Sequence, residues 1–211
     1  MRFIFRPQSV KRPQRRIIRI YSNGESEYNY FISQKQLLVR QFAIDGRRNI
    51  KIDSFQRNAD IKAMIQVIKK LNPVRDLLPG DRIYCVLDVD DLRNNKINEA
   101  LAIKPPYINL ILSNPNFELW LLLHFRFHNQ RITKDETVVK LREYLPHYSK
   151  PNIEPIFPTL KEKEPDAIRN SKTLREQRKQ EQIDLFSIES NPHTHLDFLI
   201  EFLNSLIIDD T

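Results

Sequence analysis

The first 125 residues alternate between short β-type runs and longer helix-type segments, and this alternation constrains the fold more than any other feature. Strands are expected over residues 16–21, within 42–55, and over 82–87 and 108–112, and helices over residues 25–40, 58–71, 91–103 and 117–124. Residues 83–87 are all apolar, which is typical of a central parallel strand covered on both faces. The alternation therefore predicts an α/β fold in which a parallel sheet of about four strands is flanked by helices.

Capping signals mark where several helices are expected to begin. Thr133 and Glu136 have the spacing of a capping box, which predicts a helix over the residues that follow Thr133. Asn114 is expected to cap the helix over 117–124, with Pro115 at its first position. Pro192 is expected to begin the last helix, because proline is favoured in a first turn.

The remainder of the chain, beyond residue 125, has a mainly helical pattern. Residues 149–165 are rich in Pro, Lys and Glu, and we expect them to form a mobile loop. Taken together, the patterns predict a basic arm over residues 1–14 and a single domain over 15–211. Within this domain we expect an α/β core over 15–125 and a helical extension over 126–211.

The net charge of +7 is concentrated at the start of the chain. Seven basic residues precede the first acidic residue, Glu25, and without them the 34 basic residues become 27, which equals the number of acidic residues. These seven are Arg2, Arg6, Lys11, Arg12, Arg15, Arg16 and Arg19. A basic arm of this kind can bind the phosphate backbone of nucleic acid, for which Arg12, Arg15 and Arg16 are the candidates. The alternative is a tail that only improves solubility.

Several classes of protein are disfavoured by the composition. The sequence contains no stretch of 18 or more apolar residues, so we expect no membrane span. The first residues also lack the pattern of a signal peptide. We therefore expect a cytoplasmic protein without membrane contact. Cys85 is the single cysteine, which excludes an intramolecular disulfide framework, and its apolar neighbours predict a buried structural thiol.

Polar clusters directly follow three of the expected strands, over residues 22–27, 88–91 and 113–118. Ligands of parallel α/β sheets bind at the edge formed by the carboxyl ends of the strands. If the three strands are neighbours, their carboxylates converge there, and no basic residue lies within the clusters to neutralise them. A divalent cation is the natural compensation for this negative charge.

The spacing of Asp88 and Asp90 allows both carboxylates to reach the same hard cation at the end of a strand. Mg²⁺ and Mn²⁺ prefer such oxygen ligands, whereas zinc prefers His or Cys. An alternative for the Asp-x-Asp pattern is capping of the next helix. Glu118 is interpreted either as a ligand near this cluster or as an acid that favours the start of its own helix.

The three histidines His124, His193 and His195 are weaker candidates for function. His124 is expected to be a hydrogen-bonded packing residue rather than a catalytic base. His193 and His195 are expected to take part in starting the last helix, and the alternative is that they approach a substrate phosphate or a partner.

Four segments resemble, in the same order, the motifs of the RloB-like family. They are residues 17–31 (IIRIYSNGESEYNYF), 82–91 (RIYCVLDVDD), 113–125 (SNPNFELWLLLHF) and 191–195 (NPHTH). The resemblance implies a TOPRIM-like fold, as in topoisomerases, primases and overcoming-lysogenization-defect nucleases. It also implies a metal site for Mg²⁺ or Mn²⁺, built from a glutamate after the first strand and an Asp-x-Asp after a later one. RloB-like proteins tend to be encoded beside an AAA- or ABC-type ATPase in restriction or abortive-infection loci, so the resemblance implies such a partner.

The sequence departs from the family pattern at Asn23, where the family has a glutamate directly before the glycine. Asparagine can offer a carbonyl oxygen to a metal ion, but it cannot act as a general base, so Glu25 or Glu27 would replace the missing carboxylate. The candidate catalytic residues are Glu25, Glu27, Asp88, Asp90 and Glu118, and the candidate metal ligands are Asn23, Glu27, Asp88, Asp90 and Asp91.

Two functions are consistent with these residues. The first is a metal-dependent nuclease effector of antiphage defence that hydrolyses DNA or RNA, including tRNA, and acts with the ATPase. The second is a catalytically inactive TOPRIM-like module that docks an ATPase or a nucleic acid. Both functions are compatible with a homo-oligomer.

Overall fold

The computed structural model describes residues 16–42, 48–54, 61–89 and 94–208. The proposed basic arm, including Arg12, lies outside the described residues, and so does Arg15. The sheet consists of β1 (Arg16–Ser22), β2 (Arg48–Ser54), β3 (Arg82–Asp88), β4 (Ile108–Asn114) and β5 (His193–Thr194). The strand order is β2-β1-β3-β4-β5, and the first four of these are parallel while β5 runs antiparallel to β4. The predicted parallel sheet of four strands is thus confirmed.

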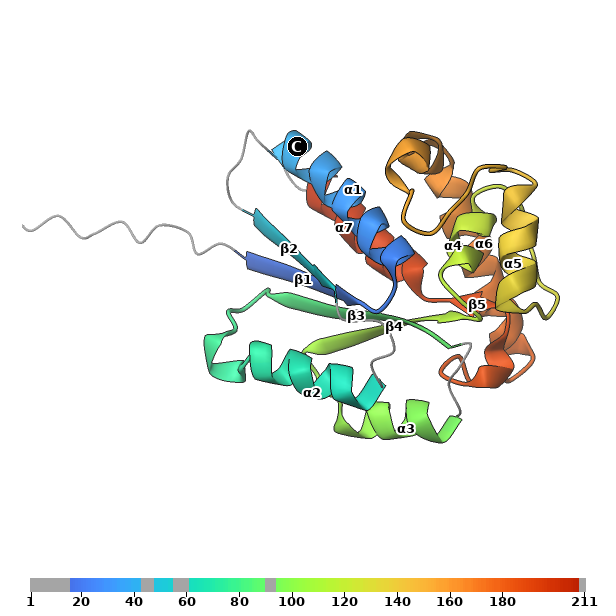
Figure 1. The fold of residues 1–211 in the computed structure, drawn as a ribbon. Coiled ribbons are helices and arrows are strands. Elements are labelled where there is room, and N and C mark those ends of the chain that lie inside the picture. Colours follow the sequence, from blue (N-terminus) through green and yellow to red (C-terminus); the bar gives the residue numbers. More distant parts are fainter. Residues whose placement is uncertain (1–15, 43–47, 55–60, 90–93, 209–211) are drawn as a thin grey trace, which may run out of the picture.

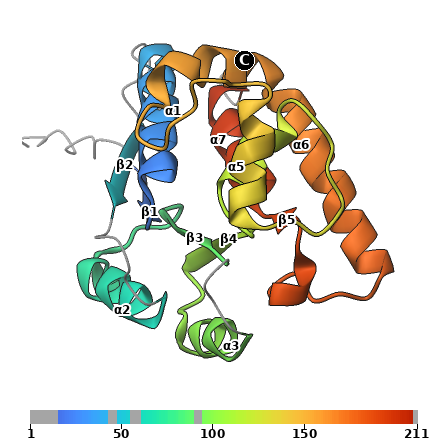
Figure 2. The same cartoon turned by 45° about the vertical axis from the view of Figure 1, so that its right-hand side comes forward.

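Helices cover both faces of this sheet and also extend beyond its β5 edge. They are α1 (Glu25–Phe42), α2 (Ile61–Leu71), α3 (Asn94–Ile103), α4 (Glu118–Leu123), α5 (Lys134–Arg142), α6 (Phe157–Gln180) and α7 (Leu196–Ile208). Figure 1 shows α1 and α7 above the sheet, α2 and α3 below it and α5 near β5, and Figure 2 shows α6 beyond β5. The α/β class and the helical C-terminal part are therefore confirmed. None of the described helices combines the length and the apolar character that crossing a membrane requires.

Strand β3 lies in the middle of the sheet and supplies both hydrophobic cores. Tyr84 and Val86 face the core beneath α1 and α7, whereas Ile83, Cys85 and Leu87 face the core against α2 and α3. This is the two-sided burial that an uninterrupted apolar strand predicts. Cys85 is fully buried, and this burial raises the pKa of its thiol to about 12.

Helix α4 is buried on every side, as its hydrophobic sequence predicts. Its start differs from the prediction, however, because β4 continues through Asn114 and the helix begins only at Glu118. The Asn114–Pro115 peptide bond is cis. The Asn114 side chain does not cap α4, whose N-cap position is Phe117 and has no side-chain cap hydrogen bond. Asn114 Nδ2 donates to the carbonyl oxygens of Ser187 (3.2 Å) and Ile188 (3.1 Å).

The C-terminal helices also correct the sequence-based boundaries. Pro192 does not begin the last helix, since the short strand β5 follows it and α7 starts at Leu196, whose N–H donates to Thr194 Oγ1 (3.2 Å). Of the segment expected as a loop over 149–165, residues 149–156 lie outside the α-helices, whereas residues 157–165 form the first part of α6, with Leu160 buried in the core. The capping box of Thr133 and Glu136 at α5 is confirmed.

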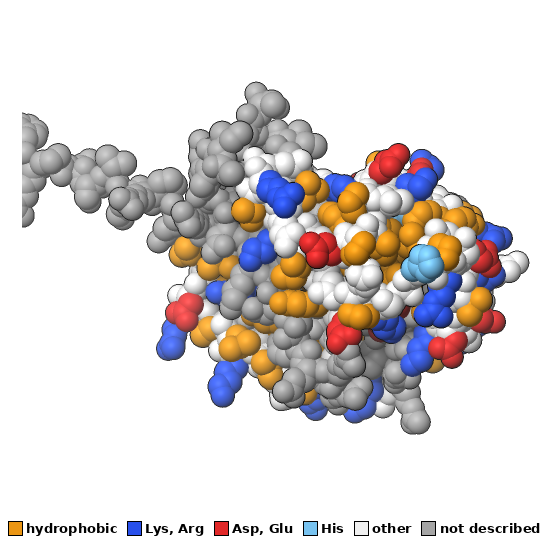
Figure 3. Space-filling view, turned by 45° about the horizontal axis from the view of Figure 1, so that its top comes forward, with side chains coloured by type: hydrophobic (Ala, Val, Ile, Leu, Met, Phe, Trp, Pro, Cys, Tyr) orange, Lys and Arg blue, Asp and Glu red, His pale blue; other side chains and the backbone are white. Residues whose placement is uncertain are grey.

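The surface carries charges of both signs. On the face shown in Figure 3, basic and acidic side chains alternate with apolar ones, so the described residues form no continuous patch of one sign there. This distribution agrees with a body in which basic and acidic residues balance.

Candidate functional site

The three polar clusters lie side by side, because β1, β3 and β4 are neighbours in the sheet. Ser22 is in register with Val86, and Asp88 is in register with Ser113. Since side chains alternate along a strand, Ser22, Asp88 and Ser113 all face the α1 and α7 side of the sheet. The structure thus brings the clusters to a single edge, as the order of motifs predicts for a parallel sheet.

Asp88 ends β3 and connects this strand to the turn before α4. Its Oδ1 accepts a hydrogen bond from the backbone N–H of Phe117 (2.8 Å), and the N–H of Val89 donates to the carbonyl oxygens of Ser113 (2.9 Å) and Pro115 (3.1 Å). The Asp88 side chain is partly exposed. It is therefore a fixed carboxylate at an accessible edge.

Other predicted site residues cannot be placed in the same way. Asp90 and Asp91 lie outside the described residues, which end at Val89 and resume at Asn94. Arg16 is the first residue of β1, so its backbone lies at the opposite end of that strand from Ser22 and the polar edge.

Two glutamates in the first turn of α1 differ clearly in their surroundings. Glu25 is exposed, whereas Glu27 is buried with an exposed fraction of 3%. The Glu27 carboxylate lies directly against Gly24, where an added Cβ would be 2.1 Å from Glu27 Oε2. Glycine is thus required for this position of the carboxylate. The geometry favours Glu27 over Glu25 as the acid of this edge, although Glu27 also suits the positive end of the helix.

Glu118 is the most thoroughly hydrogen-bonded acid of the site. Its Oε1 accepts from Tyr148 Oη (2.8 Å) and Ser26 Oγ (3.1 Å), and its Oε2 accepts from Asn116 Nδ2 (2.7 Å). Lys150 adds a positive charge 3.6 Å from Oε1. This network connects the start of α1, the start of α4 and the segment after α5, and Glu118 is the residue that all three segments contact.

Tyr148 is a hydrogen-bond donor in this network rather than an acid. Burial, followed by the charge of Glu118, raises the pKa of its hydroxyl, which therefore keeps its proton. Sequence reasoning missed Tyr148 and Lys150, and it also missed the roles of Ser26 and Asn116. Tyr148 and Lys150 follow α5 and carry no motif, so only the fold shows that they reach Glu118.

Three oxygen atoms at the same edge are buried without a hydrogen-bond partner among the described residues. They are Ser22 Oγ, Asn23 Oδ1 and Asn116 Oδ1. Buried polar atoms are normally satisfied, so each of these is a candidate ligand for a bound group. Amide, hydroxyl and carboxylate oxygens are donors of the type that Mg²⁺ and Mn²⁺ prefer.

Within the described residues, no group of three or more His, Cys, Asp or Glu side chains lies close enough together to hold a metal ion. A complete metal site at this edge would therefore need Asp90 or Asp91 besides Glu27 and Asp88. The oxygen donors already present fit a hard cation better than zinc.

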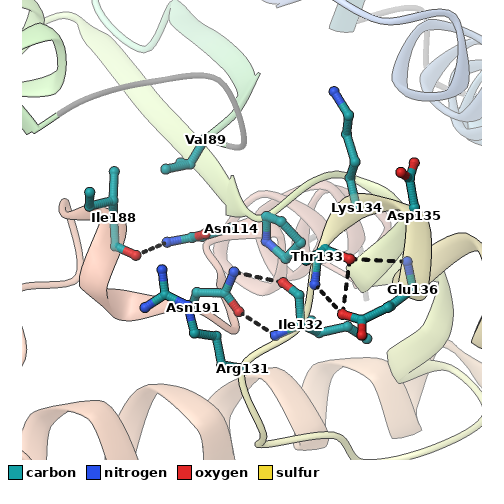
Figure 4. Close-up of a pocket in the computed structure, with 11 residues that line it drawn as sticks. Val89, Asn114, Arg131, Ile132, Thr133, Lys134, Asp135, Glu136, Ile188 and Asn191 are labelled. Carbon is teal, nitrogen blue, oxygen red and sulfur yellow. Dashed lines mark hydrogen bonds between the residues drawn. The ribbon is translucent and has the colours of Figure 1, made fainter.

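A hollow of about 620 Å³ opens beside Val89, next to the polar edge. Figure 4 shows its lining residues, including Asn114 at the end of β4 and Arg131 and Lys134 near the start of α5. Asn191, from the NPHTH motif, fixes the opposite wall: its Oδ1 accepts from the N–H of Ile132 (2.9 Å) and its Nδ2 donates to the carbonyl oxygen of Ile132 (2.8 Å). The late motif therefore shapes this hollow.

The late histidines have packing contacts in the structure. His193 is paired with Asn114 in the sheet, and its ring contacts that of His195 edge to face, with the ring centroids 4.5 Å apart. Capping of α7 comes instead from Thr194, which stands between them. His124 is buried, and its Nδ1 lies 2.8 Å from the carbonyl oxygen of Trp120, as expected of a packing residue.

The fold and this edge define an α/β protein with carboxylate, hydroxyl and amide oxygens at the carboxyl ends of its parallel strands. Residues 18–203 match the family model of the RloB-like proteins, so the chain belongs to the RloB-like family. The family resemblance inferred from the motifs is thereby confirmed. Neither the curated proteins nor the solved structures include a match to this chain.

Proposed function

We propose that this RloB-like protein is a metal-dependent nuclease that hydrolyses phosphodiester bonds in DNA or RNA. The observation that carries the proposal is that two carboxylates, Glu27 and Asp88, and the unpaired buried oxygens of Asn23 and Asn116 all follow neighbouring parallel strands at one end of the sheet. Such a set of oxygen donors suits a divalent cation, and a parallel sheet places it at the usual ligand-binding edge.

Mg²⁺ or Mn²⁺ would be held by Asp88, Glu27 and Asn23, with Asp90 and Asp91 as further ligands. When bound, the ion would activate water and stabilise the negative charge that develops on the phosphate. Asp88 is oriented for this role by the N–H of Phe117. Glu118 acts indirectly, by fixing Asn116 and the start of α1.

We propose that the hollow beside Val89 binds the part of the nucleic acid that flanks the cleaved phosphodiester bond. Arg131 is exposed on its wall, where a guanidinium suits a phosphate of the nucleic acid. Arg12, in the basic arm, and Arg15 and Arg16, which follow it, are proposed to add further contacts to the nucleic-acid backbone. An antiphage role with an AAA- or ABC-type ATPase is proposed from the family resemblance.

The test compares charge-neutralising variants with a matched control. Asp88→Asn keeps an oxygen that can accept from Phe117 N–H, so it removes the charge with little effect on the fold, and Glu27→Gln does the same at the second carboxylate. Asp76→Asn is the control, because Asp76 is exposed and lies before β3, at the other end of that strand. The purified chain is incubated with Mn²⁺ or Mg²⁺ and with plasmid DNA, single-stranded DNA or tRNA, with and without the ATPase encoded nearby.

The proposal predicts cleavage by the wild type and by Asp76→Asn, with a loss of about a hundredfold or more in both site variants. The double variant Asp88→Ala, Asp90→Ala should be inactive as well. Full activity of Asp88→Asn and of the double variant would refute the assignment of the site.

A catalytically inactive binding module is the second candidate, and the observation that favours it is Asn23 in place of the family glutamate. Calorimetric titration with Mn²⁺ distinguishes the two candidates. A specific Mn²⁺ site that is lost in Asp88→Asn supports the nuclease. No binding at millimolar Mn²⁺, together with no cleavage under any condition, supports the binding module.

A further inference from the structure

The outer edge of β4 is paired over only part of its length. β5 pairs with Ser113 and Asn114, and His195 continues the contact by donating its N–H to the carbonyl oxygen of Leu112 (2.9 Å). Backbone groups alternate in direction along a strand, so the N–H and carbonyl of Leu110 point to the same edge as those of Leu112. Among the described residues, no strand lies beside Leu110 at this edge.

A pocket of about 510 Å³ lies along this unpaired part of β4. Asn109, Leu110 and Ile111 form one side of it, and Phe186 and Phe198 are the aromatic rings among its other lining residues. Phe198 has an exposed fraction of 49%, so part of its ring is accessible from the pocket. The pocket is therefore a groove beside Leu110, whose N–H and carbonyl oxygen lie between two residues, Ile108 and Leu112, that already have partners at this edge.

The charges around the pocket are all positive. Lys104, Arg175 and Lys179 contribute to the lining, and no acidic side chain among the described residues does so. The Lys104 ammonium donates to the carbonyl oxygen of Ile108 (2.7 Å), which places its charge at the strand edge. Arg175 lies over the ring of Phe198, with its Cζ 4.1 Å from the centroid.

The three cations differ in their acidic partners. Arg175 pairs with Asp197 and Lys179 with Glu176. Lys104 has no acidic partner within the described parts of the chain. A negative charge brought to this edge would therefore be met first by Lys104.

We propose that the outer edge of β4 binds an extended, acidic segment of a partner protein, which adds to the sheet as a further strand. The main chain of the segment would pair with Leu110, an acidic side chain would meet Lys104, and an apolar side chain would enter the groove at Phe186 and Phe198. Strand addition of this kind obtains affinity from the main chain and specificity from pockets for alternate side chains.

Other occupants fit the edge less well. The basic residues at the start of this chain would be repelled by Lys104, Arg175 and Lys179. Single-stranded nucleic acid would be attracted by cations and aromatic rings, but it does not offer the alternating main-chain groups that Leu110 requires. The proposal does not depend on nuclease activity, because the β4 edge and the carboxylates at Asp88 and Glu27 are separate sets of residues.

The first test is a selection from a display library of random peptides of about 12 residues, with the full chain as the immobilised target. Binding of the selected peptides is then measured by fluorescence anisotropy. We expect enrichment of sequences that alternate acidic and apolar residues. Lys104→Glu should weaken their binding about tenfold or more, and so should Phe198→Ala, which removes an exposed ring without changing the charge.

Lys69→Glu is the matched control, because Lys69 is exposed in the last turn of α2, on the other face of the sheet. It should leave the affinity unchanged, and circular dichroism checks that all variants keep their helices. Hydrogen exchange provides an independent measurement: a bound peptide should slow the exchange of the Leu110 amide about tenfold or more.

The proposal is overturned by a selection that enriches no peptide family. It is equally overturned by selected peptides that bind Lys104→Glu as tightly as the wild type or leave Leu110 exchange unchanged. A single-stranded oligouridylate that competes fully with the peptides and binds with higher affinity would instead assign the groove to nucleic acid.

Discussion

We expect the protein to lose stability when the pH falls from 7.5 to 5, because buried neutral histidines take up protons on unfolding. His124 is 1% exposed and contacts Trp120 both through its Nδ1 and ring to ring. Burial lowers the pKa of His124 to about 4. His195 has an equally lowered pKa of about 4, from burial and then the charge of Arg175, and its Nδ1 accepts from the N–H of Leu112 (3.4 Å).

The size of this loss of stability follows from the difference between the histidine pKa values in the folded and the unfolded chain. An unfolded histidine has a pKa of about 6.5, so between pH 6.5 and 4 the unfolded chain binds more protons than the folded one. Stability is therefore unaffected by these groups above pH 6.5 and is lost progressively as the pH falls toward 4. For a folded pKa of about 4, each histidine costs about 2 kcal/mol between pH 7.5 and 5. Together His124 and His195 cost about 4 kcal/mol, which is a large part of the stability of a typical domain.

One carboxylate, that of Asp197, has the opposite effect on the pH dependence of stability. Burial raises the pKa of Asp197, so its folded form binds a proton more readily and gains stability as the pH falls. The change in the wild type is therefore a sum of several groups. A variant that removes a single histidine isolates that histidine, because the contribution of Asp197 cancels when the variant is compared with the wild type.

The assay is urea unfolding, followed by the fluorescence of the single tryptophan, Trp120, at pH 7.5 and pH 5. In His124→Gln, the loss of unfolding free energy between the two pH values should be smaller than in the wild type by about 2 kcal/mol. His147→Gln, at an exposed position, is the control and should keep the full loss. Coincident pH dependences of His124→Gln and the wild type would refute the argument that buried neutral His124 couples stability to pH.

Three further predictions concern the site and the core. Gly24→Ala should reduce metal-dependent cleavage about tenfold or more, because its Cβ would displace the Glu27 carboxylate, and unchanged activity would argue against Glu27 as a ligand. Tyr148→Phe should lower the free energy of unfolding by about 2 kcal/mol in denaturant titrations, because Glu118 loses a hydrogen bond from its hydroxyl. Cys85 should resist thiol-specific reagents in the native protein and react once urea unfolds it, because burial keeps its thiol protonated and inaccessible.

The strands, and the polar residues that follow them, could be predicted because a parallel α/β sheet repeats a simple local pattern. The uninterrupted apolar run around Cys85 determines a central strand, and the polar residues after each strand then fall on one edge. The helix starts expected at Asn114 and Pro192 could not be predicted, because the Asn114 side chain donates to Ser187 and Ile188 and because β5 lies between Pro192 and α7.

The Glu118 network was equally beyond the sequence, since Tyr148 and Glu118 are 30 residues apart and no spacing rule connects them. The same limit applies to the β4 edge. Whether a strand is paired along both edges depends on segments that are distant in the sequence. Here the two residues of β5 pair with only the last two residues of β4.

The acids at the site differ in burial, since Glu118 and Glu27 are buried and Asp88 is partly exposed. Both oxygens of Glu118 accept hydrogen bonds from protein groups, so a cation bound directly to it would have to replace them. Its bond from Asn116 Nδ2 instead fixes the orientation of that amide and leaves Asn116 Oδ1 as a buried oxygen without a partner among the described residues. Under the proposed function, Glu118 would orient a ligand, whereas Asp88, at the end of β3, and Glu27, in the first turn of α1, would supply the negative charge that a cation requires.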